Sequence, residues 1–293
     1  MWIGLSFAAC FISAVAAVYR KSGIEGQNPF WYGAISLSIT TVTIFIIGYV
    51  IGDNRDLANM PDRTMCITLA SGVIQGLSWL TYMLAIYYID VSIVAALDKF
   101  NIVATMLFAY TMIGEKITLT MLLGTFFLIT GTLLVVGKKD YSFQSKDNSR
   151  IRKGIIWGVV SPVLMALSNV VAKADSGSVS PIETTTLRIF IVTIVLWCVF
   201  FAMKKKDSIQ IKELKMSSKN IKDNVISGVL TGVFNILMYI AIEIGIVSVV
   251  TAIVKSSVVF TVLLAYIFLN ERLTRKGRAG ILLIICGLVI VVL

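Results

Sequence analysis

The chain has 293 residues, of which 57% are hydrophobic and only 14% are charged, and its mean hydropathy is +0.89. A soluble domain carries roughly 25% charged residues, so this composition excludes a soluble globular fold. The formal net charge of +10 would suit a nucleic-acid partner, unless the basic residues lie where a membrane protein needs them.

Ten segments, taken in chain order, are long and apolar enough to cross a bilayer, which takes about 20 residues for a hydrocarbon core of roughly 30 Å. They are residues 2–19, 30–52, 64–88, 91–113, 118–137, 154–173, 181–203, 224–244, 247–269 and 278–293. The segments are too uniformly apolar for barrel strands, which alternate over about ten residues. The sequence therefore predicts an all-α, multi-pass membrane protein with ten transmembrane helices.

The basic residues gather in the connections between the predicted helices. The two long connections, 138–153 and 204–223, are the richest in Lys and Arg, and all the Lys/Arg-rich connections fall on one side of the membrane. Positively charged loops stay on the cytoplasmic side. This pattern explains the net charge without any nucleic-acid partner, and it places both termini outside.

The chain repeats itself at an offset of 156 residues. Residues 92–118 and 248–274 are identical at 11 of 27 positions, and apolar bias alone would not align a lysine, a glutamate and two threonines. We predict two five-helix repeats, at 1–137 and 154–293, joined by a basic linker at 138–153. Because five is odd, the second repeat enters the membrane from the opposite side, as in the inverted repeats of secondary transporters.

Two lysines at equivalent positions of the repeat fall inside predicted helices. Lys99 lies about eight residues into its helix, or roughly 12 Å deep, and Lys255 lies at the same depth in the second repeat. A cation near the midplane is costly and marks a functional site by default. A structural ion pair or a snorkelling side chain is the alternative for each lysine.

Asp98 precedes Lys99, but neighbours on a helix point about 100° apart, so the two side chains do not pair with each other. The residue equivalent to Asp98 in the second repeat is Val254, so the carboxylate breaks the symmetry. We expect Asp98 either to neutralise Lys255 across a cavity or to carry a coupling proton, with a structural ion pair as the alternative. Asn101 shares the helix face of Asp98.

Polar and aromatic side chains share one face of the third predicted helix and of its repeat equivalent, the eighth. They are Gln75, Trp79 and Tyr82 on the third and Thr231, Asn235 and Met238 on the eighth, with Tyr239 adjacent. Such faces predict the walls of a cavity, although helix packing through hydrogen bonds would produce them too. The candidate substrate-binding residues are Lys99, Lys255, Asp98, Asn101, Gln75, Trp79, Tyr82, Asn235 and Tyr239.

Three further features have structural interpretations. Arg188 lies seven residues after Pro181, so we expect it near a membrane interface, in contact with a headgroup or a helix end. Gly72 and Gly76 form a GxxxG pair that recurs in the eighth predicted helix and lets helices approach closely. Glu115 and its repeat equivalent Glu271 are expected to cap helix ends.

The paired segments GEKIT at 114–118 and NERLT at 270–274, together with the spans and the repeat, resemble the EamA branch of the drug/metabolite transporter superfamily. The resemblance covers essentially the whole chain. It implies a ten-helix carrier of small metabolites, often an exporter, with a central cavity and with both termini cytoplasmic. Lys99 and Lys255 lie where relatives that carry phosphates and sugar nucleotides keep anion-binding lysines, but the surrounding residues do not match, so the substrate class does not transfer.

Together these features predict a secondary transporter, exporting or exchanging a small anionic or zwitterionic metabolite such as an amino acid by alternating access. An organic cation or drug exporter, a lipid-linked sugar flippase and a membrane-embedded enzyme are the alternatives. The chain has no histidine, no cysteine cluster and no nucleotide-binding loop, so we expect no enzyme activity, cofactor or metal. The expected partners are the small-molecule substrate, the lipid of a plasma or inner membrane and a proton or counter-substrate, for a monomer or homodimer.

Overall fold

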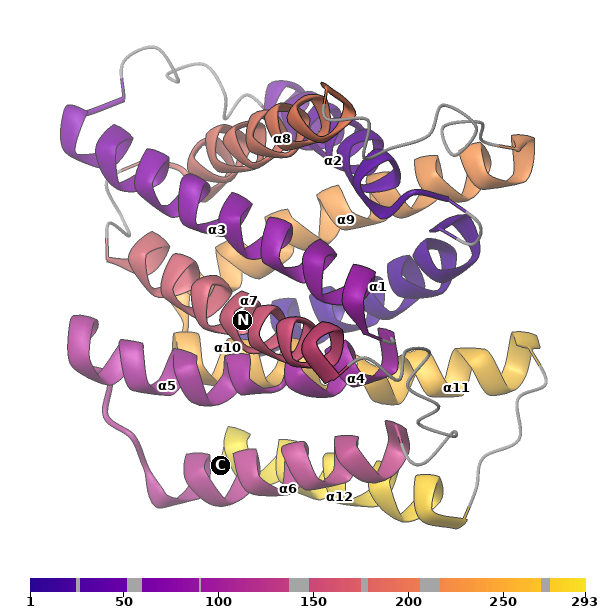
Figure 1. Cartoon of the computed structure of the whole chain (residues 1–293). Coiled ribbons are helices and arrows are strands. Elements are labelled where there is room, and N and C mark those ends of the chain that lie inside the picture. The colour runs from indigo at the N-terminus through magenta and orange to yellow at the C-terminus, as the bar shows by residue number, and fades with distance from the viewer. Residues whose placement is uncertain are drawn as a thin grey trace.

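The computed structural model describes residues 1–24, 27–51, 60–89, 91–136, 148–174, 179–205, 217–269 and 275–293. These residues form helices and no strand (Figure 1). The helices are α1 (Trp2–Ile24), α2 (Pro29–Ile51), α3 (Asp62–Tyr88), α4 (Val91–Leu97), α5 (Phe100–Ile113), α6 (Leu119–Val136), α7 (Asn148–Lys173), α8 (Pro181–Lys205), α9 (Ser218–Ile244), α10 (Val247–Lys255), α11 (Val258–Leu269) and α12 (Arg275–Val292).

Within the described ranges, six helices are long and apolar enough to cross a membrane: α1, α2, α3, α7, α8 and α9. Shorter apolar helices cover Phe100–Ile113, Leu119–Val135 and Val247–Thr261. Large apolar side chains such as Leu107 and Phe126 face outward, 57% and 63% exposed, while many polar side chains are buried. This distribution is the one expected of a helix bundle that is surrounded by lipid and encloses a polar interior.

The fourth and ninth predicted helices are each interrupted, where the sequence predicted one continuous helix. Turns at Asp98–Lys99 and Ser256–Ser257 separate α4 from α5 and α10 from α11. The backbone tightens there: the amide of Lys99 donates to the carbonyl of Ala96 at 3.2 Å, a three-residue spacing typical of a 3₁₀ turn. Neither turn contains Gly or Pro, so the usual sequence signals of a break are missing.

The helices that pack most closely on each other are far apart in the sequence. α1 packs on α9, α3 on α7, α2 on α8, and α6 on α12, and the last two lie together at the lower edge of Figure 1. The two interrupted helices meet where α5 contacts α10. The breaks therefore lie side by side in the interior, between elements more than a hundred residues apart in the sequence.

The GxxxG glycines sit at close helix contacts, which confirms their predicted role. A Cβ on Gly72 would lie 3.1 Å from Ile191 of α8, and one on Gly228 would lie 2.8 Å from Ile39 of α2. The first distance is tighter than most real Cβ contacts and the second is shorter than real Cβ atoms show, so the absence of a side chain lets α3 approach α8 and α9 approach α2.

Candidate functional site

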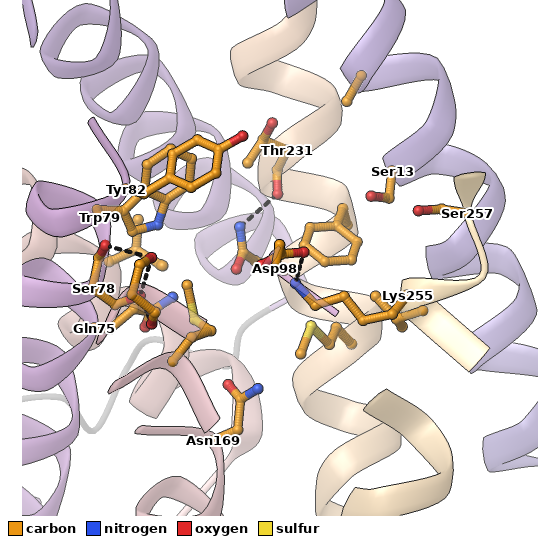
Figure 2. A pocket seen from close by; sticks show the side chains of 18 of the residues that line it. Ser13, Gln75, Ser78, Trp79, Tyr82, Asp98, Asn169, Thr231, Lys255 and Ser257 are labelled. Atoms are coloured by element: carbon orange, nitrogen blue, oxygen red, sulfur yellow. Dashed lines mark hydrogen bonds and ion pairs between the residues drawn. The ribbon is translucent and has the colours of Figure 1, made fainter. Parts of the chain in front are cut away.

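A cavity of about 250 Å³ opens between the two helix breaks and the middles of α1, α3, α7 and α9 (Figure 2). It brings together eight of the nine predicted site residues. These are Lys99, Lys255, Asp98, Gln75, Trp79, Tyr82, Asn235 and Tyr239. Its other lining residues include Ser13 and Arg20 of α1, Ser161, Met165 and Asn169 of α7, and Thr231, Phe234 and Met238 of α9.

Asp98 and Lys255 form an ion pair at the two breaks. The Lys255 ammonium lies 2.6 Å from Asp98 Oδ2, as the dashed line in Figure 2 marks, and the two side chains are 21% and 25% exposed. The expectation that Asp98 neutralises Lys255 is thereby confirmed. Because both groups face the cavity, a ligand can reach the pair.

Lys99, predicted as the equivalent of Lys255, is held quite differently. Its ammonium donates a hydrogen bond to the backbone carbonyl of Lys255 at 2.9 Å, and the residue is only 6% exposed. That carbonyl belongs to the C-terminal end of α10, where the helix dipole favours a cation. Both repeat lysines therefore join one broken helix to the other. The Lys255 side chain binds the Asp98 carboxylate, and the Lys99 side chain donates to the backbone carbonyl of Lys255.

Asn101 is the predicted site residue that the cavity does not include. It is fully buried, and its amide nitrogen donates to the backbone carbonyl of Pro162 at 3.0 Å. The contact joins α5 to α7 next to the proline of that helix. Asn101 shares a face with Asp98 only in a continuous helix, and the turn at Lys99 removes that relation.

The polar face of α3 meets that of α9 through Tyr239. Its hydroxyl lies 3.3 Å from both the Gln75 and the Asn169 side-chain carbonyl oxygens, and can donate to one at a time. Trp79 and Tyr82 stand edge to face, with ring centroids 6.1 Å apart. These side chains line the cavity and also pack one helix on another. The cavity wall and the helix packing, which the sequence offered as alternatives, are therefore both present.

Arg20 is a cavity residue that the sequence analysis missed, because it was counted with the first connection. In the structure α1 continues to Ile24, and the Arg20 guanidinium donates to Thr231 Oγ1 at 3.0 Å and lies 5.7 Å above the Trp79 ring. The spacing of seven residues between Ser13 and Arg20 places them on one helix face, and that pattern is the signal that could have revealed it.

The expectation that Arg188 lies near an interface is wrong. It is 2% exposed, its Nε donates to Ser71 Oγ at 3.0 Å, and its guanidinium carbon lies 4.1 Å from the centre of the Tyr239 ring. A long side chain can carry its charge far from its own backbone. The number of residues between the start of α8 and Arg188 therefore did not give the depth of the guanidinium in the membrane. Arg188 therefore supports Tyr239 from behind the cavity.

Glu115 caps a helix, as expected, but the helix belongs to the other end of the chain. Its carboxylate accepts hydrogen bonds from the Val247 amide at 2.7 Å and from the Ser248 hydroxyl at 2.8 Å, at the start of α10. A carboxylate at a helix N-terminus satisfies free amides and opposes the helix dipole. Glu271 and the NERLT segment lie outside the described residues.

A family model described as the EamA-like transporter family matches residues 1–137 and 152–293. The chain belongs to the EamA-like transporter family. This EamA-like chain is accordingly a multi-pass, all-helical membrane transporter. Among its described residues, no group of three or more His, Cys, Asp or Glu side chains could hold a metal ion.

Two further proteins resemble this EamA-like chain. A Sinorhizobium protein named as an uncharacterized transporter in the cobO 3′ region is 33% identical over 134 residues, which cover 46% of this chain and 93% of the relative. A solved crystal structure superposes with a TM-score of 0.80 at 14% identity, covering 98% of this chain and 94% of its own. The second likeness shows a shared fold alone.

Proposed function

We propose that the protein is a secondary carrier of a small organic anion or zwitterion, such as an amino acid, and that it exports or exchanges this substrate across the cell membrane. The observation that carries the proposal is the charge of the cavity. Three basic side chains line it, Arg20, Lys99 and Lys255, against one carboxylate, Asp98. Because Asp98 is already paired with Lys255, the cavity has an excess of positive charge that a negatively charged group would offset.

We further propose that residues 1–137 and 154–293 are two inverted five-helix repeats linked by 138–153. The helix pairing supports this, since exchanging each helix for its repeat equivalent turns the α1–α9 contact into the α7–α3 contact and leaves α2–α8 and α6–α12 unchanged. The Sinorhizobium relative also supports it, because 46% of this chain covers 93% of that protein. A site between two such halves is the arrangement that alternating access requires.

The Asp98–Lys255 ion pair would couple the substrate to this exchange. It joins the break of one half to the break of the other, at 2.6 Å. An anion bound in the cavity attracts the Lys255 ammonium and repels the Asp98 carboxylate, and so weakens the contact between the halves. The same change could move a proton, if Asp98 becomes protonated when it separates from Lys255.

An organic cation is the second candidate substrate, and the aromatic wall favours it. Trp79, Tyr82, Phe234 and Tyr239 line the cavity, and aromatic faces attract cations. Against this, the basic side chains repel a cation, and the carboxylate that would bind it is occupied by Lys255. A lipid-linked sugar has no comparable observation in its favour.

The test is a comparison of substrate classes on the purified full-length protein. Thermal-shift screening against anionic, zwitterionic and cationic metabolites should give stabilisation by compounds that carry a carboxylate or phosphate. Uptake of those compounds into liposomes, with and without a pH gradient, then measures transport and proton coupling. Stabilisation and uptake of cations alone would overturn the proposal.

A further inference from the structure

We infer that Arg20 is the residue that binds the substrate's anionic group, and that this group is a carboxylate held by the Arg20 guanidinium beside Thr231 and Trp79. The inference rests on the proposed function and deepens it. It also changes the roles of the cavity cations, since the sequence named Lys99 and Lys255, and not Arg20, among the candidate substrate-binding residues.

The two lysines are already engaged. Lys255 is paired with Asp98 at 2.6 Å. Lys99 is buried and donates to the Lys255 carbonyl at 2.9 Å. An anion would have to displace a partner from either lysine, and removing one partner of a buried pair is costly.

Arg20 has donors to spare. A guanidinium carries five N–H donors, and within the described part of the chain Arg20 has one hydrogen-bond acceptor, Thr231 Oγ1 at 3.0 Å. No carboxylate of the described residues lies within ion-pair distance of Arg20. Arg20 is thus a partly exposed cation of the cavity wall without a direct carboxylate partner among those residues.

The guanidinium is held in place before any ligand arrives. Thr231 binds one of its nitrogens, and the Trp79 ring lies 5.7 Å from its central carbon. α1 packs on α9, so the Thr231 contact is part of a helix interface. A guanidinium fixed in this way loses little freedom when a planar, two-oxygen anion binds to it in a bidentate manner.

The planar fork of Arg20 matches a carboxylate, which presents two coplanar oxygens and a single negative charge. Lys99, the other cavity cation without a carboxylate partner, is already bound to the Lys255 carbonyl. Trp79 and Tyr82, which lie together on one wall of the cavity in Figure 2, would contact the rest of the substrate. The inferred substrate is therefore a small monocarboxylate, including the zwitterionic amino acids.

The experiment uses the full-length protein and matched probes. Among the common amino acids, the one that stabilises the wild type most is compared with its own carboxamide, which lacks the negative charge. Arg20→Gln should weaken binding of the amino acid by about 10- to 100-fold, the loss expected for hydrogen bonds to a charged group. Binding of the carboxamide should not change.

The control is Arg150→Gln. Arg150 also stacks on an aromatic ring, 5.6 Å from that of Tyr87, but it does not line the cavity. Equal loss in both variants, or an unchanged preference for the carboxylate in Arg20→Gln, would overturn the inference. A wild type that binds phosphates but no carboxylate would overturn the inference and leave the proposed function standing, whereas a wild type that binds neither would overturn the proposed function.

A second variant covers the case in which Arg20→Gln does not fold. Arg20→Lys keeps the charge but loses the planar fork, so it should fold and bind the amino acid about tenfold more weakly than the wild type. If it binds the amino acid as tightly as the wild type does, the bidentate contact is wrong.

Discussion

The charged side chains in and beside the cavity are held by three different kinds of contact. Asp98 and Lys255 form an ion pair, Lys99 donates to a backbone carbonyl, and Arg20 and Arg188 lie over aromatic rings. Each contact lowers the free energy of a charge that lipid-facing placement would make very costly. The charges of Asp98, Lys255, Lys99, Arg20 and Arg188 add up to a net positive charge, which is why we assign an anion to the cavity.

Removing the carboxylate from the Asp98–Lys255 pair should destabilise the protein. Asp98→Asn leaves the Lys255 ammonium unpaired, and we expect a loss of about 1–3 kcal/mol, below the value for a fully buried pair because both groups are partly exposed. Thermal unfolding in detergent measures the effect. Asp62→Asn, a change in the exposed first turn of α3, should cost less than about 1 kcal/mol, the contribution of an exposed carboxylate to a helix N-terminus.

The double variant Asp98→Asn with Lys255→Met should recover most of that stability, since no charge is left without a partner. Transport into liposomes should stay impaired, because the contact between the two breaks is lost. Recovery of both stability and transport would show that the pair is structural only.

Glu115 gives a second test at the residue scale. Glu115→Ala removes the acceptor of the Val247 and Ser248 amides and should lower the free energy of unfolding by about 1 kcal/mol, as expected for the loss of a helix cap. The neighbouring exposed residue supplies the control, Lys116→Ala, which should have no measurable effect on thermal unfolding. Equal stability of the two variants would contradict the capping role.

At the scale of elements, the helix breaks and the glycine contacts decide how closely the helices meet. The break after Lys255 leaves its carbonyl free to accept a hydrogen bond from Lys99, and Lys255 in turn binds Asp98 at the other break. Each interrupted helix therefore satisfies a polar group of the other. α6 and α12 meet through glycines on both sides: a Cβ on Gly131 would lie 2.6 Å from the Gly280 carbonyl, and the reverse distance is also 2.6 Å.

Gly131→Ala should therefore push α6 away from α12. The added methyl group meets backbone, which cannot rotate aside, so we expect a loss of about 1–3 kcal/mol in thermal unfolding. Gly4→Ala is the matched control, because nothing lies within 4 Å of the added Cβ, and alanine is the better helix former. A neutral Gly131→Ala would mean that the two helices can separate freely.

At the scale of the whole molecule, the outer surface is apolar and the interior polar among the described residues, and the sequence predicts that the basic connections share one side of the membrane. The bias of Lys and Arg predicts that this side is cytoplasmic, while the family resemblance implies the reverse orientation. Both statements concern exposed residues, so they can be compared directly on intact cells.

Cysteine labelling tests the orientation. In a variant without Cys10, Cys66, Cys198 and Cys286, the replacement Ser217→Cys should react with an impermeant reagent only after the membrane is opened. Thr118→Cys, in an exposed connection on the opposite side, should react on intact cells. The reverse pattern would place both termini in the cytoplasm.

The sequence by itself determined the membrane environment, the positions of Asp98, Lys99 and Lys255 in the interior, and most of the cavity. These follow from local properties, because hydropathy sets the spans and a spacing of three or four residues sets a helix face. Gln75, Trp79 and Tyr82 could thus be assigned to one wall before any contact was known.

Only the tertiary structure decided what each charge does. Lys99 and Lys255 have equivalent sequence positions, yet one binds a backbone carbonyl and the other a carboxylate. Arg20 owes its place in the cavity to Thr231, and the break at Lys99 faces the break at Ser256. The physical reason is common to all of them: a charge in the membrane is stabilised by partners from distant helices, and no local pattern specifies which partner the fold supplies.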